Sequence, residues 1–385
     1  MEIYIIDMKI TISNSSFCDA VRAHAEAYPL MKPRDAVKLA FQAAFGPAHM
    51  IDDPSAAIEH MKKEAAKAPS HSFFGNGCCD IGGGFSRVFL HSKMDRETLD
   101  LIGKMFVMTA AESAAKSAAK SAATRCTNDI KDAIFPFYEE LFSAAERGMF
   151  SFTRDELAAE IAAHEAAGFP AVSHSEEFRA AYSPSYRVVK SEYAQLMPLM
   201  IEIWRARERA KKSGKTAIFA LDGRCASGKT TLSAEISALF DCPIISMDDF
   251  FLPPDKRTEE RLLEVGGNVD YERFRAEVLD APSGNGIEYS VFDCSKMKIA
   301  GIKRVPPCPL WLIEGSYSHH PYFKDHGGRE VIRAFMTVDP QRQRERIIRR
   351  NGEKIWENFH HRWIPMEEAY FSAFGIESCD FILTT

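Results

Sequence analysis

The sequence predicts an α/β protein whose C-terminal half forms a parallel β-sheet with helices on both faces, preceded by a mainly α-helical domain. Three observations lead to this fold class. After residue 215, short apolar runs alternate with helical segments, which is typical of parallel strands buried on both faces. Before residue 205, apolar residues recur three and four positions apart, as in amphipathic helices. A glycine-rich segment also joins the first apolar run to a helical segment. The predicted strands are 216–221, 243–246, 310–313, 331–338 and 381–384.

The composition is that of a globular protein. The chain has 385 residues, of which 46% are hydrophobic and 26% charged. Lysine and arginine number 48 against 54 aspartate and glutamate, and the net charge of −6 argues against a nucleic-acid partner. No apolar run approaches the ~20 residues that span a membrane, the first residues do not resemble a secretory signal, and the nine cysteines form no CxxC pair. We therefore expect a cytoplasmic protein without a membrane partner, and homo-oligomerisation is left open.

The first half of the chain is predicted to be one helical domain. Helices are expected at 20–26, 34–45, 56–67, 154–167 and 192–210, and the alanine-rich segment 110–124 is expected to form an exposed helix. A charged stretch ending in Ser-Gly-Lys215 precedes the first predicted strand. These features predict a mainly helical domain of unknown function at 1–205, a linker at 206–215 and a second domain at 216–385.

Within the helical domain, three features are candidates for function. His49 follows a Gly-Pro-Ala segment, and a packed or capping histidine is the favoured interpretation. The loop Ile81-Gly-Gly-Gly-Phe-Ser-Arg87 could bind an anion together with Arg87, but a plain turn is favoured. The segment 174–190 combines His174 with Arg179, Tyr182, Tyr186 and Arg187. None of the three assigns a function by itself.

The strongest motif is Gly223-Arg-Cys-Ala-Ser-Gly-Lys-Thr230, which matches the phosphate-binding pattern G-x-x-x-x-G-K-[ST] between a predicted strand and a predicted helix. Glycines allow backbone N–H groups to surround phosphate oxygens at a helix N-terminus. Lys229 is predicted to reach the phosphates of ATP, and the Thr230 hydroxyl is predicted to bind Mg²⁺. The predicted nucleotide contacts in this loop are Gly223, Ala226, Ser227, Gly228, Lys229, Thr230 and Thr231.

Acidic residues follow the predicted strands of the second domain. Asp248 and Asp249 come after the strand 243–246, and Glu314 ends the strand 310–313. The carboxyl ends of parallel strands form the ligand-binding edge of such sheets, so one aspartate could accept a proton from a substrate hydroxyl and Glu314 could bind Mg²⁺ with Thr230. Asp270 opens an amphipathic helix. For Asp248, Asp249 and Asp270, helix or turn capping is the alternative interpretation.

A late helix carries several arginines. Arg342, Arg346 and Arg349 share one face of a helix with about 3.6 residues per turn. Three guanidinium groups on one stripe could bind phosphates and neutralise the charge of a transferring phosphoryl group. A solvated charged face is the alternative interpretation.

Taken together, residues 216–385 resemble the uridine kinase and phosphoribulokinase family of P-loop kinases. The resemblance rests on the Gly223–Thr230 loop, the segment at Asp248, Asn268-Val-Asp270, Ile313-Glu-Gly315 and the arginine helix. It implies that Asp248 is the general base, that Asp249, Asp270 and Phe292 lie on the substrate side, and that Glu314 lies on the magnesium side. It also implies that Arg342 and Arg349 contact the nucleotide and that Lys229 and Arg346 stabilise the transferring group. The resemblance implies a P-loop NTPase sheet as the fold of this half.

Two departures from the family pattern leave the acceptor open. Phe251 stands where the family has a tyrosine, and no histidine follows Phe292-Asp293 where uridine kinases have a base-reading one. The expected activity is therefore transfer of the γ-phosphoryl group of ATP to a hydroxyl of a nucleoside-like or other small hydroxylated molecule. The alternative is a regulatory ATPase or switch with an N-terminal effector-binding module, and a second enzyme in residues 1–205 is a further alternative. Cys225, if exposed, is expected to make nucleotide binding sensitive to oxidation or alkylation.

Overall fold

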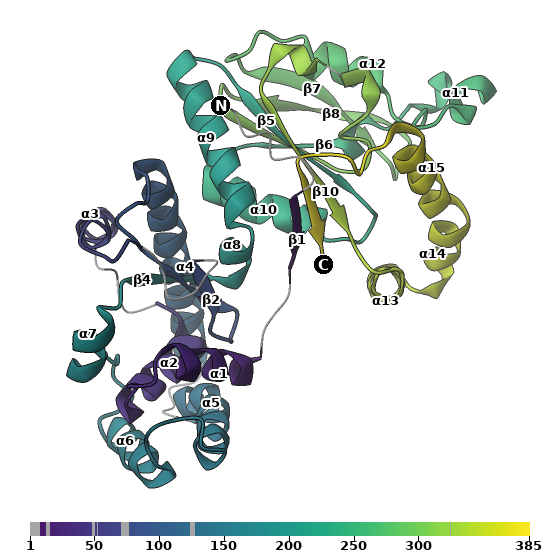
Figure 1. Ribbon diagram of the computed structural model, residues 1–385. Coiled ribbons are helices and arrows are strands. Elements are labelled where there is room, and N and C mark those ends of the chain that lie inside the picture. The colour runs from purple at the N-terminus through teal and green to yellow at the C-terminus, as the bar shows by residue number, and fades with distance from the viewer. Residues whose placement is uncertain are drawn as a thin grey trace. The chain divides into compact units, whose positions relative to one another are not determined.

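The structure is a computed structural model that describes residues 8–12, 16–47, 51, 53–70, 77–123, 128–323 and 325–385 (Figure 1). Its contacts divide the chain into two compact units. The N-terminal unit spans Ser13–Met197, and the C-terminal unit comprises Pro198–Thr385 together with the segment that ends at Ile12. Among the described helices, none combines the length and the apolar character needed to cross a membrane.

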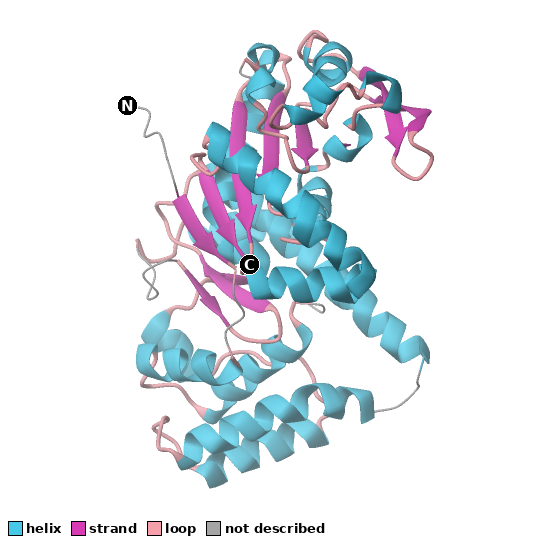
Figure 2. Cartoon of the chain, turned by 90° about the vertical axis from the view of Figure 1, so that its right-hand side faces the viewer, coloured by secondary structure: helices cyan, strands magenta, loops and turns pink. Residues whose placement is uncertain are grey.

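A six-stranded parallel sheet forms the centre of the C-terminal unit (Figures 1 and 2). Its strand order is β1 (Met8–Thr11), β11 (Phe381–Thr384), β10 (Val331–Thr337), β5 (Ala217–Gly223), β9 (Leu310–Glu314) and β6 (Ile244–Ser246). Every residue of β5 and β9 is buried. The predicted α/β sheet with helices on both faces is therefore confirmed, because strands that are apolar throughout need cover on both faces.

The remaining elements of this unit surround the sheet. An antiparallel hairpin is formed by β7 (Ile287–Asp293) and β8 (Lys298–Val305). The helices are α9 (Met197–Ser213), α10 (Lys229–Phe240), α11 (Glu259–Leu263), α12 (Tyr271–Phe274), α13 (Pro340–Asn351), α14 (Glu353–Asn358) and α15 (Ile364–Phe374).

The register of the parallel strands brings the predicted site residues to one edge of the sheet. Glu314 pairs with Ser246 of β6 and with Leu221 of β5, and Gly223 pairs with Met336 of β10. Since these residues end their strands, the glycine-rich loop after β5 and the acidic segments after β6 and β9 leave the sheet on the same side.

The N-terminal unit is mainly helical, as predicted, and also contains a small antiparallel sheet. Its core gathers apolar side chains of α1, α2, α5 and α6, with Ala36, Leu39 and Leu141 fully buried. The helices are α1 (Phe17–Ala27), α2 (Pro33–Phe45), α3 (Pro54–Ala65), α4 (Arg96–Ala123), α5 (Asn128–Glu146), α6 (Arg154–Ala166), α7 (Glu176–Tyr182) and α8 (Ser191–Gln195). The strands β2 (Cys78–Asp80), β3 (Phe85–Phe89) and β4 (Tyr186–Lys190) pair in that order.

The unit boundaries differ from those expected from the sequence. Residues 206–213, predicted as part of a linker, belong to α9, because Ile203, Ala206 and Ala210 form a buried stripe at helical spacing. Residues 8–11, assigned from the sequence to the helical domain, pair with β11 in the sheet of the C-terminal unit. His49 lies outside the described residues.

Candidate active site

The glycine-rich loop connects β5 to α10 with the backbone geometry of a phosphate-binding loop. Gly223 has φ +139°, and a Cβ atom at this position would lie 2.1 Å from the Met336 carbonyl oxygen. Gly228, with φ +107°, forms the N-cap of α10. Both positions favour glycine, since L-residues with side chains rarely adopt such angles. The first turn of α10 therefore presents its backbone N–H groups at the end of the loop.

Lys229 folds back over this loop. Its Nζ donates hydrogen bonds to the carbonyl oxygens of Gly223, at 2.5 Å, and Arg224, at 2.9 Å. The lysine is buried, whereas Thr230 and Thr231 are exposed on the first turn of α10. Among the described residues, the buried Ser227 hydroxyl has no hydrogen-bond partner. The loop thus holds an ammonium group and a hydroxyl group that fit phosphate oxygens.

The acidic residues predicted at the strand ends lie within electrostatic range of Lys229. Glu314 is buried and accepts a 3.0 Å hydrogen bond from Ser246 Oγ. Desolvation raises the pKa of Asp248, with a smaller contribution from Asp249, while Lys229 and Arg350 act in the opposite direction. The pKa of Glu314 is likewise raised by desolvation and by Asp248. Lys229 therefore lowers, and the neighbouring carboxylates raise, the pKa of Asp248 and of Glu314 at this edge of the sheet.

Asp249 and Phe292 contact the β-hairpin. Asp249 accepts a 3.1 Å hydrogen bond from the Tyr289 hydroxyl of β7 and lies 3.8 Å from Lys303 of β8. Phe292 is a buried β7 residue next to a bulge. Neither residue has an isolated surface position, so changes at either one also affect the packing of the hairpin.

Asp270 is enclosed by protein groups. It is 1% exposed, caps α12 through the Arg273 N–H, and pairs with Lys256 Nζ at 3.0 Å. Arg273 Nε lies 3.4 Å from the same carboxylate oxygen. The N-cap interpretation of Asp270 is confirmed, and a hydroxylated substrate would have to share this carboxylate with two cations.

Of the three α13 arginines that the sequence singled out, Arg346 is the one that contacts the loop in the described structure. Its guanidinium donates to the carbonyl oxygens of Ala226 and Ser227, both at 3.1 Å. Arg342 and Arg349 are exposed, and their side chains form no hydrogen bond with the described residues. A neighbouring residue, Gln343, donates to the Cys225 carbonyl oxygen at 2.9 Å. The helix therefore lies against the loop, with two of its arginines directed to solvent.

Two buried acids support the loop and were not expected from the sequence. Asp222, fully buried at the end of β5, accepts hydrogen bonds from the backbone N–H groups of Gly223, Tyr317 and His319 and from the Tyr370 hydroxyl. Glu367 of α15 accepts from the Cys225 N–H and from the Ser316 hydroxyl. An aspartate inside an apolar strand is a signal that could have identified Asp222. Glu367 carries no such signal.

Cys225 is half-buried, and burial together with Glu367 raises the pKa of its thiol well above the ordinary value. The thiolate is the reactive form of cysteine. The structure therefore does not support the sensitive, exposed thiol that the sequence analysis considered.

The described residues contain no preformed metal cage. Among the described residues, no three His, Cys, Asp or Glu side chains are placed to hold a metal ion together. Mg²⁺ in nucleotide sites is usually bound by one or two protein oxygens together with phosphates and water. The Thr230 hydroxyl and the Glu314 carboxylate are oxygen ligands of this kind.

The sheet and its strand–loop–helix connection define the C-terminal unit as a P-loop NTPase fold. No family model matches the chain, and no curated protein matches it. Three solved structures show weak similarity. A provisionally named uridine kinase from Bacillus stearothermophilus has 16% identity and a TM-score of 0.33, and the match covers 46% of this chain and 99% of that one. A provisionally named fructose transport system kinase from Silicibacter sp. TM1040 has 20% identity and a TM-score of 0.33, over 45% and 95%. An uncharacterised protein from Eubacterium ventriosum has 14% identity and a TM-score of 0.26, over 44% and 88%.

Proposed function

We propose that the C-terminal unit is an ATP-dependent kinase that phosphorylates a hydroxyl group of a small molecule. The observation that supports this most is the position of Lys229 and of the Asp248, Asp249 and Glu314 carboxylates at one edge of the sheet, beside a glycine-rich loop. A loop alone would bind a nucleotide. A loop with a carboxylate beside it can also direct the terminal phosphoryl group onto an alcohol.

In this proposal, the loop binds the triphosphate. Backbone N–H groups of 226–230 donate to phosphate oxygens, and Lys229 exchanges the carbonyl oxygens of Gly223 and Arg224 for phosphate oxygens. Thr230 and Glu314 would hold Mg²⁺. ATP with Mg²⁺ supplies the activated phosphoryl group and neutralises part of its charge.

Asp248 is proposed as the base. Its raised pKa makes its carboxylate a stronger proton acceptor than an ordinary aspartate, so it can orient and deprotonate a hydroxyl group at neutral pH. Asp249, Asp270 and Phe292 would lie on the acceptor side, near the hairpin. Arg346, already bonded to the loop, would move its guanidinium onto the transferring group, with Arg342 and Arg349 as further nucleotide contacts.

The experiment is an ATP-consumption screen of the full chain against nucleosides, sugars, vitamins and small hydroxy acids. We expect one class of acceptor to accelerate ATP consumption and to yield a phosphorylated product. In Asp248→Asn, acceptor-dependent turnover should fall by at least about 100-fold while nucleotide binding persists. Slow hydrolysis that no acceptor accelerates would instead favour the alternative, a regulatory ATPase or switch.

A further inference from the structure

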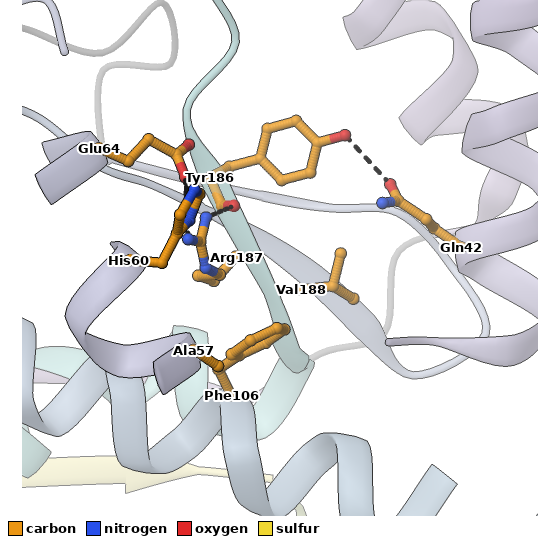
Figure 3. Close-up of a pocket in the computed structure, with 8 residues that line it drawn as sticks. All are labelled: Gln42, Ala57, His60, Glu64, Phe106, Tyr186, Arg187 and Val188. Atoms are coloured by element: carbon orange, nitrogen blue, oxygen red, sulfur yellow. Dashed lines mark hydrogen bonds and ion pairs between the residues drawn. The ribbon is translucent and has the colours of Figure 1, made fainter. Parts of the chain in front are cut away.

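The N-terminal unit contains a cavity of about 300 Å³ that the proposed kinase chemistry does not use (Figure 3). It lies between α2, α3, α4 and β4. This volume is at the lower end of the range for small-molecule sites. The cavity has an apolar wall, formed by Ala57, Phe106 and Val188, and a polar side, formed by Gln42, His60, Glu64, Tyr186 and Arg187.

Behind the polar side lies Arg87, which is only 2% exposed. Its guanidinium donates to Gln42 Oε1 from Nε at 3.0 Å and from Nη2 at 2.7 Å, and it lies 4.5 Å from the centre of the Tyr186 ring. Among the described residues, no carboxylate lies within ion-pair distance of Arg87. A buried cation with only neutral partners is costly, and a nearby anion would offset that cost.

The other buried charges near Arg87 do not cancel it. Lys38 is buried, donates to the Val172 carbonyl oxygen at 2.8 Å, and has a pKa lowered to about 8 by desolvation and by Arg87. Asp35 is buried and hydrogen-bonded to His174 and Ser175. Desolvation lowers the pKa of His174 to about 4, so this histidine is neutral at pH 7. Two cations therefore face one carboxylate in the interior behind the cavity.

The Arg87 contact also determines which way the Gln42 amide is turned. A guanidinium can only donate, so the amide oxygen must face Arg87 and the NH₂ group must lie on the other side. Gln42 is 3% exposed, and its NH₂ group has no hydrogen-bond partner among the described residues. Figure 3 shows the Gln42 amide directed toward the Tyr186 hydroxyl. The Gln42 NH₂ group, which donates to no described residue, is thus a hydrogen-bond donor on the cavity lining.

Tyr186 is held in place by a chain of hydrogen bonds. His174 Nδ1 lies 2.7 Å from Asp35, and His174 Nε2 lies 2.8 Å from the Tyr186 hydroxyl. Because the carboxylate must receive the Nδ1 proton, Nε2 accepts the Tyr186 proton. The phenol oxygen then lies 3.4 Å from Gln42 Oε1 and does not use the Gln42 NH₂ group. The Tyr186 hydroxyl is therefore held by hydrogen bonds before any ligand arrives, which lowers the entropic cost of binding.

Arg187 is a cation on the cavity lining itself. It pairs with Glu64 at 2.9 Å, donates to the Tyr186 carbonyl oxygen at 2.8 Å, and lies 5.4 Å from the Phe106 ring centre. Two of its five N–H bonds are used in these contacts. Glu64 is already neutralised by Arg187 and hydrogen-bonded by Ser185. The charges on and behind the wall therefore favour an anion over a cation.

We propose that this cavity binds a small organic anion, a carboxylate or a phosphate ester, whose acidic group is held by Arg187 and whose remaining part contacts Phe106, Val188 and the Gln42 amide. This site is independent of the proposed kinase reaction. It would make the N-terminal unit a metabolite-binding module.

The test uses four probes that share a benzene ring: benzoate, phenyl phosphate, benzamide and benzylamine. Binding to the full chain is measured by isothermal titration calorimetry. We expect at least one of the two anions to bind saturably below about 10 mM, and about tenfold more tightly than the neutral and cationic probes. Benzoate and phenyl phosphate as separate arms distinguish a carboxylate site from a phosphate site.

Variants locate the site. Ala57→Leu should fill the cavity and weaken binding of the anionic probe by about tenfold or more. Arg187→Gln should weaken its binding by a similar factor, because it removes a charged hydrogen-bond donor. The matched control is Ala56→Leu, an exposed neighbour on the same helix, which should bind as the parent chain does. Lys229→Ala should also bind normally, because it alters only the phosphate-binding loop. The proposal is overturned if neither anion saturates, if benzamide binds equally well, if Ala57→Leu has no effect, or if Lys229→Ala abolishes binding.

Discussion

The Glu367 carboxylate accepts a 2.9 Å hydrogen bond from the backbone N–H of Cys225, 142 residues earlier in the chain. A buried negative charge therefore lies against a loop whose other N–H groups are suited to phosphate. The same carboxylate accepts a 2.6 Å hydrogen bond from the Ser316 hydroxyl, which follows β9. Glu367 thus joins α15, the loop after β5 and the loop after β9.

Neutralising Glu367 should strengthen nucleotide binding. Glu367→Gln keeps an acceptor for the Cys225 N–H but removes a negative charge next to the proposed triphosphate site, so we expect the Kd for ATP to fall by about threefold to tenfold. Calorimetry at two salt concentrations measures this effect. The matched control is Glu368→Gln on the next residue, which pairs with Arg224 instead. Unchanged or weaker binding in Glu367→Gln would show that the carboxylate mainly orders the loop.

Glu367→Gln should also make Cys225 more reactive. Burial and Glu367 both raise the pKa of this thiol, and the substitution removes the second contribution. Alkylation of Cys225 by iodoacetamide should be slow in the parent chain and measurably faster in the variant, as followed by peptide mass spectrometry. Fast alkylation of the parent chain would contradict the burial described above.

Lys229→Ala should abolish nucleotide binding without unfolding the chain. The hydrogen bonds that the Lys229 ammonium makes to described residues go to two carbonyl oxygens of its own loop, so its loss leaves no hydrogen-bonded side chain without a partner, whereas bound phosphates would lose a charge-assisted partner. We expect the Kd for ATP to rise by at least about tenfold and the melting temperature to stay nearly constant. Lys211→Ala, an exposed position on α9, is the control. Nucleotide binding that survives in Lys229→Ala would separate this loop from the proposed triphosphate site.

Asp222→Asn should destabilise the C-terminal unit. Asp222 accepts four hydrogen bonds while fully buried. Asparagine replaces one carboxylate oxygen by an NH₂ group, which cannot accept the hydrogen bonds of the donors around it. A loss of about 2–4 kcal/mol in the free energy of unfolding is expected from urea titration. Asp241→Asn, at an exposed left-handed position where asparagine is well tolerated, should change it little. A loss below that seen for Asp241→Asn would contradict a structural role for the four bonds.

The pH dependence of turnover should report Asp248. A base must be ionised to act, and the pKa of Asp248 is raised above its ordinary value of 3.8. Turnover should therefore decline on acidification at a higher pH than an ordinary aspartate would give. Because Asp248 is an exposed residue, Asp248→Asn should change the melting temperature little, and a large loss would point to a structural role for this carboxylate.

The proposed roles of Asp249, Asp270 and Phe292 depend on the acceptor and stay predictions until one is found. The cytoplasmic location and any homo-oligomer also stay predictions. The sequence predicted Asp270 as either a helix cap or a substrate ligand. The structure shows the cap, together with Lys256 and Arg273 as its charged partners.

The sequence by itself determined the features that depend on neighbouring residues. The apolar strands predict the parallel sheet, and Gly223 to Thr230 predicts the loop, because strand burial and glycine backbone angles are encoded within a few positions. Tertiary structure decided the rest. Residues 8–11 join a sheet whose other strands begin about 200 residues later, and Glu367 reaches Cys225 from α15. In the N-terminal unit, Gln42, Arg87 and His174 meet only when α2, β3 and the segment before α7 pack together. Side chains that are so far apart in the sequence leave no local pattern. Only the folded structure therefore shows which of them become hydrogen-bond or charge partners.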